Sequence, residues 1–176
     1  EVMEGEWFHT GDLGALDEDG YLTVTGRKKE IIVTAGGKNV APAGLEDPIR
    51  SNSLISQVVV VGDKKPFISA LITLDAEMLP VWLHNNGESA DMSLEEACTN
   101  PKVVAEVQKA VDAANSRVSR AESIRKFVIL PDDFTESSGH LTPKMSIKRG
   151  PIMKDYADVI DGLYTAAPVT ESLGVG

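Results

Sequence analysis

The sequence predicts an α+β fold, in which a small domain with a roughly three-stranded sheet flanked by helices follows a short β-hairpin piece. Two observations predict it. Apolar, β-branched runs occur at residues 55–61, 67–74 and 127–130, and apolar residues recur with a helical period between the second and third run. The 176 residues, 42% of them hydrophobic, suffice for one core and a smaller appended piece.

Residues 1–28 are expected to form the hairpin piece. Turn-forming residues at 11–12, 17–20 and 26 surround a β-branched strand at 21–25. A lone hairpin of this size is marginally stable in water. We therefore expect this segment to be the edge of a larger N-terminal domain, which fits a sequence without methionine at position 1.

The next segment is expected to form a strand, a glycine loop and a helix in that order. Residues 31–34 are β-branched or apolar, Gly36 and Gly37 follow them, and Pro42 suits the first position of a helix. The runs at 55–61 and 67–74 are apolar enough for buried strands. The turn at 62–66 predicts that these two strands pair as a hairpin.

Between residues 75 and 122 the pattern becomes helical. Ser93 and Glu96 have the spacing of a capping box, and Asn100 before Pro101 predicts another helix start. One stripe of apolar side chains then recurs at helical spacing: Val103, Val104, Val107, Val111, Ala114 and Val118. This stripe predicts packing of the helix inside the domain.

The chain returns to a strand at 127–130, continues as a polar loop at 131–148 and ends in a helix at 151–164. Three segments are therefore expected. Residues 1–28 belong to the edge of the N-terminal domain, residues 29–164 form the small domain with a helical insertion at 75–122, and residues 165–176 form a flexible tail.

The distribution of charge restricts the partners. A formal charge of −10 argues against a nucleic-acid surface spread over the domain. Basic residues nevertheless gather at 27–38 and at 144–149, where Glu30 is the only acid. These two stretches predict a small anion, such as a phosphate ester, as the ligand.

The apolar runs, the first residues and the cysteine and histidine content concern cellular location and metal binding. No run approaches the roughly 18 apolar residues of a membrane helix, and the first six residues lack the basic and then apolar order of a secretory signal. The single cysteine, Cys98, cannot form an internal disulfide, and no Cys/His cluster has metal-ligand spacing. We therefore expect a cytoplasmic protein without a resident metal or a transmembrane segment, compatible with peripheral contact with a membrane.

Several motifs resemble those of the adenylate-forming, AMP-binding superfamily. Residues 10–13, Thr-Gly-Asp-Leu, match a signature turn of these enzymes, and residues 26–30, Gly-Arg-Lys-Lys-Glu, match their hinge. The glycine loop at 35–42 and the Leu-Thr-Pro segment ending in Lys-Arg at 141–149 resemble bacterial long-chain fatty-acid–CoA ligases. The resemblance covers nearly the whole chain, and it implies the mobile C-terminal lid domain of such a ligase.

The resemblance implies roles for three residues near the nucleotide. Asp12 would accept the ribose hydroxyls of ATP and acyl-AMP, with Arg27 beside them. Lys29 would be the hinge about which the domain rotates between adenylation, which makes acyl-AMP and pyrophosphate, and displacement of AMP by the CoA thiol. Judged by residue type alone, Asp12 also suits a plain turn, and the segment from Arg27 to Lys29 also suits a solvated basic turn.

The glycine loop is implied to bind CoA. Gly36 and Gly37 would let the pantetheine arm pass close to the backbone, and Lys38 would steady a CoA phosphate. The alternatives are a β-turn that needs positive φ for the glycines and a plain surface position for Lys38. Glu46 matches a family glutamate, but it also suits the helix dipole and is not assigned to catalysis.

The adenylation lysine is implied to be Lys148, whose ammonium would bridge the substrate carboxylate and the α-phosphate. Lys144 is the alternative, because the Ser-Gly pair that precedes this lysine in most of the superfamily is not found directly before either residue. His9 and His140 lie beside a turn and in a loop, without a nucleophile motif. We expect neither histidine to act in catalysis.

The activity implied by the resemblance is ATP-dependent ligation of a fatty acid to CoA through acyl-AMP. ATP, Mg²⁺ and CoA would be co-substrates of the full-length enzyme, with none held tightly by this segment. Its partners would be the fatty acid, these co-substrates and the N-terminal domain of the same protein, and the isolated segment would be inactive. The alternatives are an adenylation domain that loads a carrier protein and a non-catalytic binding or interaction domain.

Overall fold

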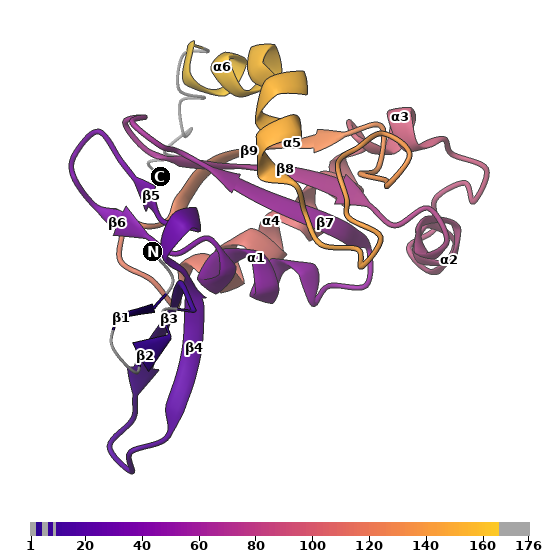
Figure 1. Cartoon of the computed structure of the whole chain (residues 1–176). Helices are drawn as coiled ribbons and strands as arrows, with labels where there is room; N and C mark the ends of the chain where they lie inside the picture. The colour runs from indigo at the N-terminus through magenta and orange to yellow at the C-terminus, as the bar shows by residue number, and fades with distance from the viewer. Residues whose placement is uncertain (1–2, 5–6, 9, 166–176) are drawn as a thin grey trace, which may run out of the picture.

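A three-stranded sheet forms the centre of the molecule (Figure 1). The computed structural model describes residues 3–4, 7–8 and 10–165. Strand β8 (Ile68–Leu74) is central, pairing antiparallel with β7 (Ile55–Val61) and parallel with β9 (Ile124–Leu130). The predicted hairpin at 62–66 and the α+β class are confirmed.

Both faces of the sheet are covered by helices (Figure 1). Successive side chains of β7 point to opposite faces, so Val58 and Val60 join one core cluster while Val59 and Val61 join another. Every residue of β8 is buried, as expected for a central strand covered on both sides. A slip of one residue would exchange the two sets, so burial fixes the register.

The first face carries α1 (Ala43–Arg50), α2 (Met78–Asn85), α3 (Leu94–Ala97) and α4 (Pro101–Asn115). The Asn100 side chain caps α4 and the Ser93 capping box begins α3, as predicted. Most of the predicted stripe on α4 is buried: Val103, Val107, Val111 and Ala114. Val104 is partly buried, and Val118, also partly buried, lies beyond the end of the helix.

The second face carries α5 (Arg149–Asp155) and α6 (Ala157–Thr165). The prediction of one helix at 151–164 is wrong in two respects, because the helix begins at Arg149 and divides at Tyr156. The backbone of Tyr156 leaves the helical region (φ −105°, ψ 20°), and its ring packs on Phe134 and His140. Thr165 still belongs to α6, and the rest of the expected tail, residues 166–176, lies outside the described residues.

The N-terminal part forms the expected hairpin. Strand β3 (Asp12–Leu16) pairs antiparallel with β4 (Leu22–Arg27), and this ribbon projects away from the sheet (Figure 1). Two-residue strands β1 (Met3–Glu4) and β2 (Trp7–Phe8) pair before it. The 3₁₀ turn η1 (Lys28–Glu30) leads to β5 (Ile32–Val33), which pairs with β6 (Asn39–Val40).

Two further expectations need correction. Strand β9 begins at Ile124 rather than at residue 127, because an edge strand tolerates charged side chains such as Arg125 on its exposed side. The loop at 131–148 is not uniformly polar, since Phe134, His140 and Leu141 are buried in it. No helix within the described ranges is long and apolar enough to cross a membrane.

Candidate functional site

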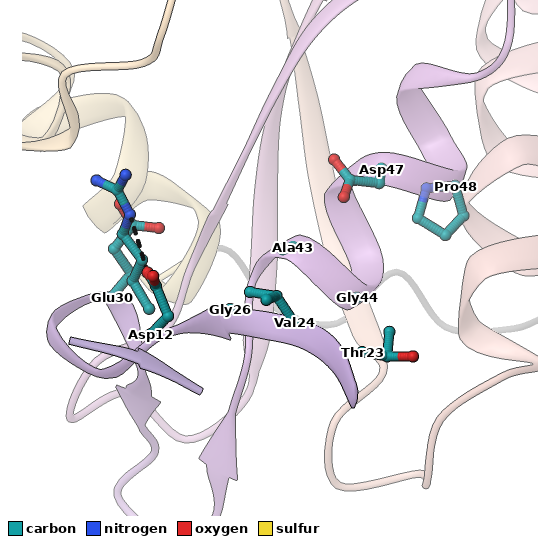
Figure 2. Close-up of a pocket in the computed structure, with 10 residues that line it drawn as sticks. Asp12, Thr23, Val24, Gly26, Glu30, Ala43, Gly44, Asp47 and Pro48 are labelled. Carbon is teal, nitrogen blue, oxygen red and sulfur yellow. Dashed lines mark ion pairs between the residues drawn. The ribbon is translucent and has the colours of Figure 1, made fainter. Parts of the chain in front are cut away.

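Asp12 and Arg27 are direct cross-strand partners on β3 and β4. Arg27 Nε lies 3.6 Å from Asp12 Oδ1, and the dashed line in Figure 2 marks this ion pair. The Arg27 side chain is 72% exposed, so the pair contributes little to stability and both groups remain accessible to a ligand. The Asp12 N–H donates to the Thr10 hydroxyl at 3.1 Å, so in this local bond the Thr10 side chain, and not the Asp12 carboxylate, is the acceptor.

The pair lies at one end of a pocket of about 630 Å³ between the hairpin and α1. Figure 2 shows Asp12 and Glu30 at that end, and Asp47 and Pro48 of α1 at the other. Three carboxylates and one guanidinium line it, so its acceptors suit the hydroxyls of a sugar better than they suit a bare phosphate. Binding of a ribose by Asp12 stays a prediction.

Lys29 lies in η1, the turn that connects the hairpin to the sheet domain. It is exposed, and the residues on both sides of the turn, Arg27 and Ile31, are extended. A second cavity of about 260 Å³ lies beside this turn, and its lining includes Lys29, Glu30 and Arg149. A connection that carries an exposed lysine next to open space can change its φ and ψ without breaking core packing.

The predicted glycine loop joins β5 to β6. The Gly37 N–H donates to the Thr34 carbonyl at 2.8 Å and the Lys38 N–H to Thr34 Oγ1 at 3.1 Å. Gly37 has φ +76°, so the turn itself requires a glycine there. Gly36 has ordinary φ, and the nearest atom to a Cβ added there is Thr34 Oγ1 at 3.9 Å. The fold therefore leaves the backbone at Gly36 open without requiring its glycine.

Lys38 is a surface residue whose side chain is 45% exposed and forms an ion pair. Its Nζ lies 3.6 Å from Glu122 Oε1. Hydrogen bonds from the Ser119 hydroxyl and N–H lower the pKa of the Glu122 carboxyl, and Lys38 adds to this effect. A phosphate that binds Lys38 must therefore compete with an ionised carboxylate.

Lys148 immediately precedes α5, and its side chain is exposed. Its N–H donates to the His140 carbonyl at 2.8 Å, and Leu141 bridges Ile147 next to this bond. Residues 140–148 therefore form a small hairpin, which we call the lysine hairpin. Lys148 stands at its base, whereas Lys144 stands at its tip beside Met145, a residue in the left-handed region (φ 60°).

Glu46 and Arg149 form a contact that the sequence analysis did not predict. Arg149 Nη2 lies 2.8 Å from Glu46 Oε1 and 2.6 Å from Oε2, and the Val60 N–H donates to Oε1 at 2.7 Å. Burial raises the pKa of the Glu46 carboxyl, while Arg149 and the Val60 N–H oppose that rise. The signal was present in the sequence: Glu46 lies between Leu45 and Ile49 on the apolar face of α1, where a carboxylate needs a cationic partner.

Taken together, the structure joins Asp12 to Arg27 and places Lys29, the residue predicted to be the hinge, two positions after Arg27 in η1. It separates the glycine loop, on β5 and β6, from Lys148, at the start of α5. His9 lies outside the described residues, whereas His140 is buried and hydrogen-bonded. Among the residues that the structure describes, no cluster of histidine, cysteine and acidic side chains could hold a metal ion.

Comparisons with known sequences agree with these motifs. Residues 29–168 match the family described as the AMP-binding enzyme C-terminal domain. Long-chain-fatty-acid–CoA ligase FadD15 of Mycobacterium tuberculosis is 58% identical over 164 residues, which are 93% of this chain and 27% of that protein. Human long-chain-fatty-acid–CoA ligase ACSBG1 is 34% identical over 180 residues, 93% of this chain and 25% of that protein. The chain thus spans about a quarter of the length of these relatives.

Solved structures share the fold. The adenylation domain of a carboxylate reductase from Mycobacterium chelonae superposes with a TM-score of 0.71 at 20% identity, over 94% of this chain and 24% of that one. Mycobacterium tuberculosis fatty acyl CoA synthetase superposes with a TM-score of 0.51 at 23% identity, over 90% of this chain and 26% of that one. At these identities the likeness concerns the fold alone. The family match over most of the chain decides membership, and the chain belongs to the AMP-binding enzyme C-terminal domain family.

Proposed function

We propose that this chain is the C-terminal domain of a long-chain fatty-acid–CoA ligase that converts a fatty acid and ATP to acyl-AMP and then transfers the acyl group to CoA. The observation that carries the proposal is the 58% identity with FadD15 over 93% of the chain. The site geometry supports it, because a lysine hairpin and an open glycine loop lie on separate elements of one small domain.

In the first half-reaction the domain presents the lysine hairpin. The Lys148 ammonium lies between the fatty-acid carboxylate and the α-phosphate, where negative charge accumulates as the acyl-phosphate bond forms. Asp12 accepts the ribose hydroxyls, and Arg27 lies beside them. Pyrophosphate leaves, and acyl-AMP remains bound.

In the second half-reaction the domain turns about Lys29 and presents the glycine loop. The pantetheine arm passes along the backbone at Gly36 and Gly37, and Lys38 exchanges Glu122 for a phosphate of CoA. The CoA thiol attacks the acyl carbon, AMP leaves, and the thioester forms. The lysine hairpin is away from the reacting atoms at this stage, so the two half-reactions depend on different residues of this chain.

The rest of the proposal concerns Mg²⁺, the N-terminal domain, the cellular location and the activity of the isolated chain. The phosphates of ATP and groups outside this chain would bind Mg²⁺, which would neutralise phosphate charge, and the N-terminal domain of the same protein would supply the fatty-acid pocket. We place the enzyme in the cytoplasm, where ATP and CoA are both available. The isolated chain folds but makes no acyl-CoA, because it lacks those pockets.

A chimaera tests this proposal without the rest of the natural protein. The segment of FadD15 that matches this chain is replaced by residues 1–176, and palmitate and ATP are supplied with either CoA or a carrier protein as the thiol. We expect palmitoyl-CoA from the chimaera and none from the isolated chain. A chimaera that forms acyl-AMP but transfers the acyl group only to a carrier-protein thiol would mean a carrier-loading domain. A correctly folded chimaera without either half-reaction would contradict the proposal.

A further inference from the structure

The side chain of His140 is enclosed between the loop at 131–148 and helix α5. It is 8% exposed. Its Nδ1 lies 2.9 Å from Ser138 Oγ and its Nε2 lies 2.9 Å from Asp155 Oδ2. The rings of Phe134 and Tyr156 pack against it with centroid distances of 5.4 and 5.6 Å. Both nitrogens and both neighbouring aromatic rings therefore hold the imidazole in place.

The backbone of the same residue holds Lys148. The His140 carbonyl accepts the Lys148 N–H at 2.8 Å, and this bond closes the base of the lysine hairpin. Lys148 directly precedes the first residue of α5, whereas Asp155 is the last residue of that helix. His140 thus contacts α5 at both ends, through its carbonyl at the first and through its ring at the second.

A lysine hairpin that is attached to α5 at two points can move less than one that is attached at a single point. Helix α5 has seven residues, a length of roughly 10 Å at 1.5 Å per residue. A hairpin bonded only at Lys148 could pivot about that bond, and the ammonium at the end of a long, flexible side chain would move with it. The second bond, from the ring to Asp155, restricts this movement at the far end of α5, in addition to the ion pair of Arg149 with Glu46 at its start.

We propose that His140 is a positioning residue for adenylate formation. Its ring bond to Asp155 and its carbonyl bond to Lys148 hold the base of the lysine hairpin against α5, so that the Lys148 ammonium enters the site in one orientation. The inference rests on the function proposed above for Lys148. A cation that stabilises developing charge must be in place before the reaction, and a misplacement of about 1 Å can cost about a hundredfold in rate.

The test uses variants of the chimaera at both ends of the ring contact. His140→Leu fills the space without a hydrogen bond, His140→Gln keeps an N–H donor, and Asp155→Ala removes the acceptor. His84→Leu is the matched control, because His84 is an exposed histidine in the last turn of α2. Three quantities are measured: the single-turnover rate of acyl-AMP formation, the rate of thioester formation from supplied acyl-AMP, and hydrogen exchange of the Lys148 amide.

We expect His140→Leu to slow acyl-AMP formation about tenfold or more and to leave thioester formation within about twofold. Asp155→Ala should do the same, and the double variant should be no slower than either single one, because both remove one contact. His140→Gln should recover much of the rate, and His84→Leu should change nothing. Exchange of the Lys148 amide should quicken in the two slow variants.

Three results would overturn the inference. Equal losses in both half-reactions with a lower melting temperature would mean that His140 only stabilises the fold. Faster amide exchange with normal acyl-AMP formation would mean that the held orientation is irrelevant to the reaction. If the wild-type chimaera forms no acyl-AMP, the proposed function fails, and the exchange measurement still decides the structural part: an unchanged Lys148 amide in His140→Leu would refute the anchoring role.

Discussion

Arg149 Nη2 lies within 2.8 Å of both carboxylate oxygens of Glu46, a residue 103 positions earlier in the chain. This ion pair joins α5 to α1 across the edge of the sheet, and the Val60 carbonyl also lies near the guanidinium, at 3.4 Å from Nη1. Because Arg149 directly follows Lys148, the pair fixes the backbone next to the adenylation lysine proposed above.

Breaking this ion pair from one side should be costly. Arg149→Met leaves the Glu46 carboxylate buried without its cation, which should lower the free energy of unfolding by about 3 kcal/mol. Glu46→Leu should cost a similar amount. The double variant Glu46→Leu with Arg149→Met should recover most of the loss, because no buried charge remains. Urea denaturation of the 176-residue chain measures all three, and single variants within about 0.5 kcal/mol of wild type would refute a buried, coupled pair.

The two glycines of the loop should behave differently. A methyl group at Gly36 meets no atom nearer than 3.9 Å, so Gly36→Ala should leave the free energy of unfolding nearly unchanged. Gly37→Ala should cost about 1 kcal/mol, because Gly37 has φ +76°. If CoA passes along this backbone, Gly36→Ala should still raise the KM for CoA in the chimaera.

Two measurements on Gly36→Ala and Gly37→Ala test these expectations. Steady-state kinetics give the KM for CoA, and urea denaturation gives the free energy of unfolding. Normal KM for CoA in Gly36→Ala would mean that the loop does not approach the thiol substrate. A strong loss of stability in Gly36→Ala would mean that the open space beside it is filled in solution.

The hinge assignment can be tested by restricting one backbone angle. Lys29→Pro fixes φ near −65° and should trap one domain orientation, so acyl-AMP formation should continue while thioester formation falls sharply. Lys29→Ala is the matched control, because it removes the charge and keeps the backbone free, and it should affect neither half-reaction strongly. Parallel losses of both half-reactions in Lys29→Pro would argue against a hinge at this residue.

Elements that depend on interactions between neighbours in the sequence were predicted, whereas features that depend on contacts between distant residues were not. The strand at 55–61 was predicted with its observed bounds, because a β-branched run before a Gly-Asp turn is a local signal. The start of α4 was likewise predicted from Asn100 and Pro101, since capping involves neighbours in the sequence. The division of the last helix at Tyr156 was missed, because its ring packs on side chains that lie 16 and 22 positions away.

The candidate site shows the same division. Asp12, Arg27 and the glycine loop were identified from short motifs, and the structure pairs the first two across one hairpin. The contacts of Glu46 and His140 were missed, because each depends on a partner brought near by the tertiary fold. A glutamate on the apolar face of a helix indicates that a cationic partner exists, and a buried histidine needs hydrogen-bond partners. Neither sequence pattern identifies which residue that partner is.

The central claim, that Lys148 supplies the charge for adenylation, is tested most directly by single-turnover measurement of both half-reactions on Lys148→Ala and Lys144→Ala chimaeras. Removing one preorganised donor to a developing charge should slow acyl-AMP formation at least about a hundredfold in Lys148→Ala, and leave thioester formation from supplied acyl-AMP near the wild-type rate. Lys144→Ala should be mild in both assays. A severe adenylation defect in Lys144→Ala together with a mild one in Lys148→Ala would contradict the assignment and place the catalytic ammonium at the tip of the lysine hairpin.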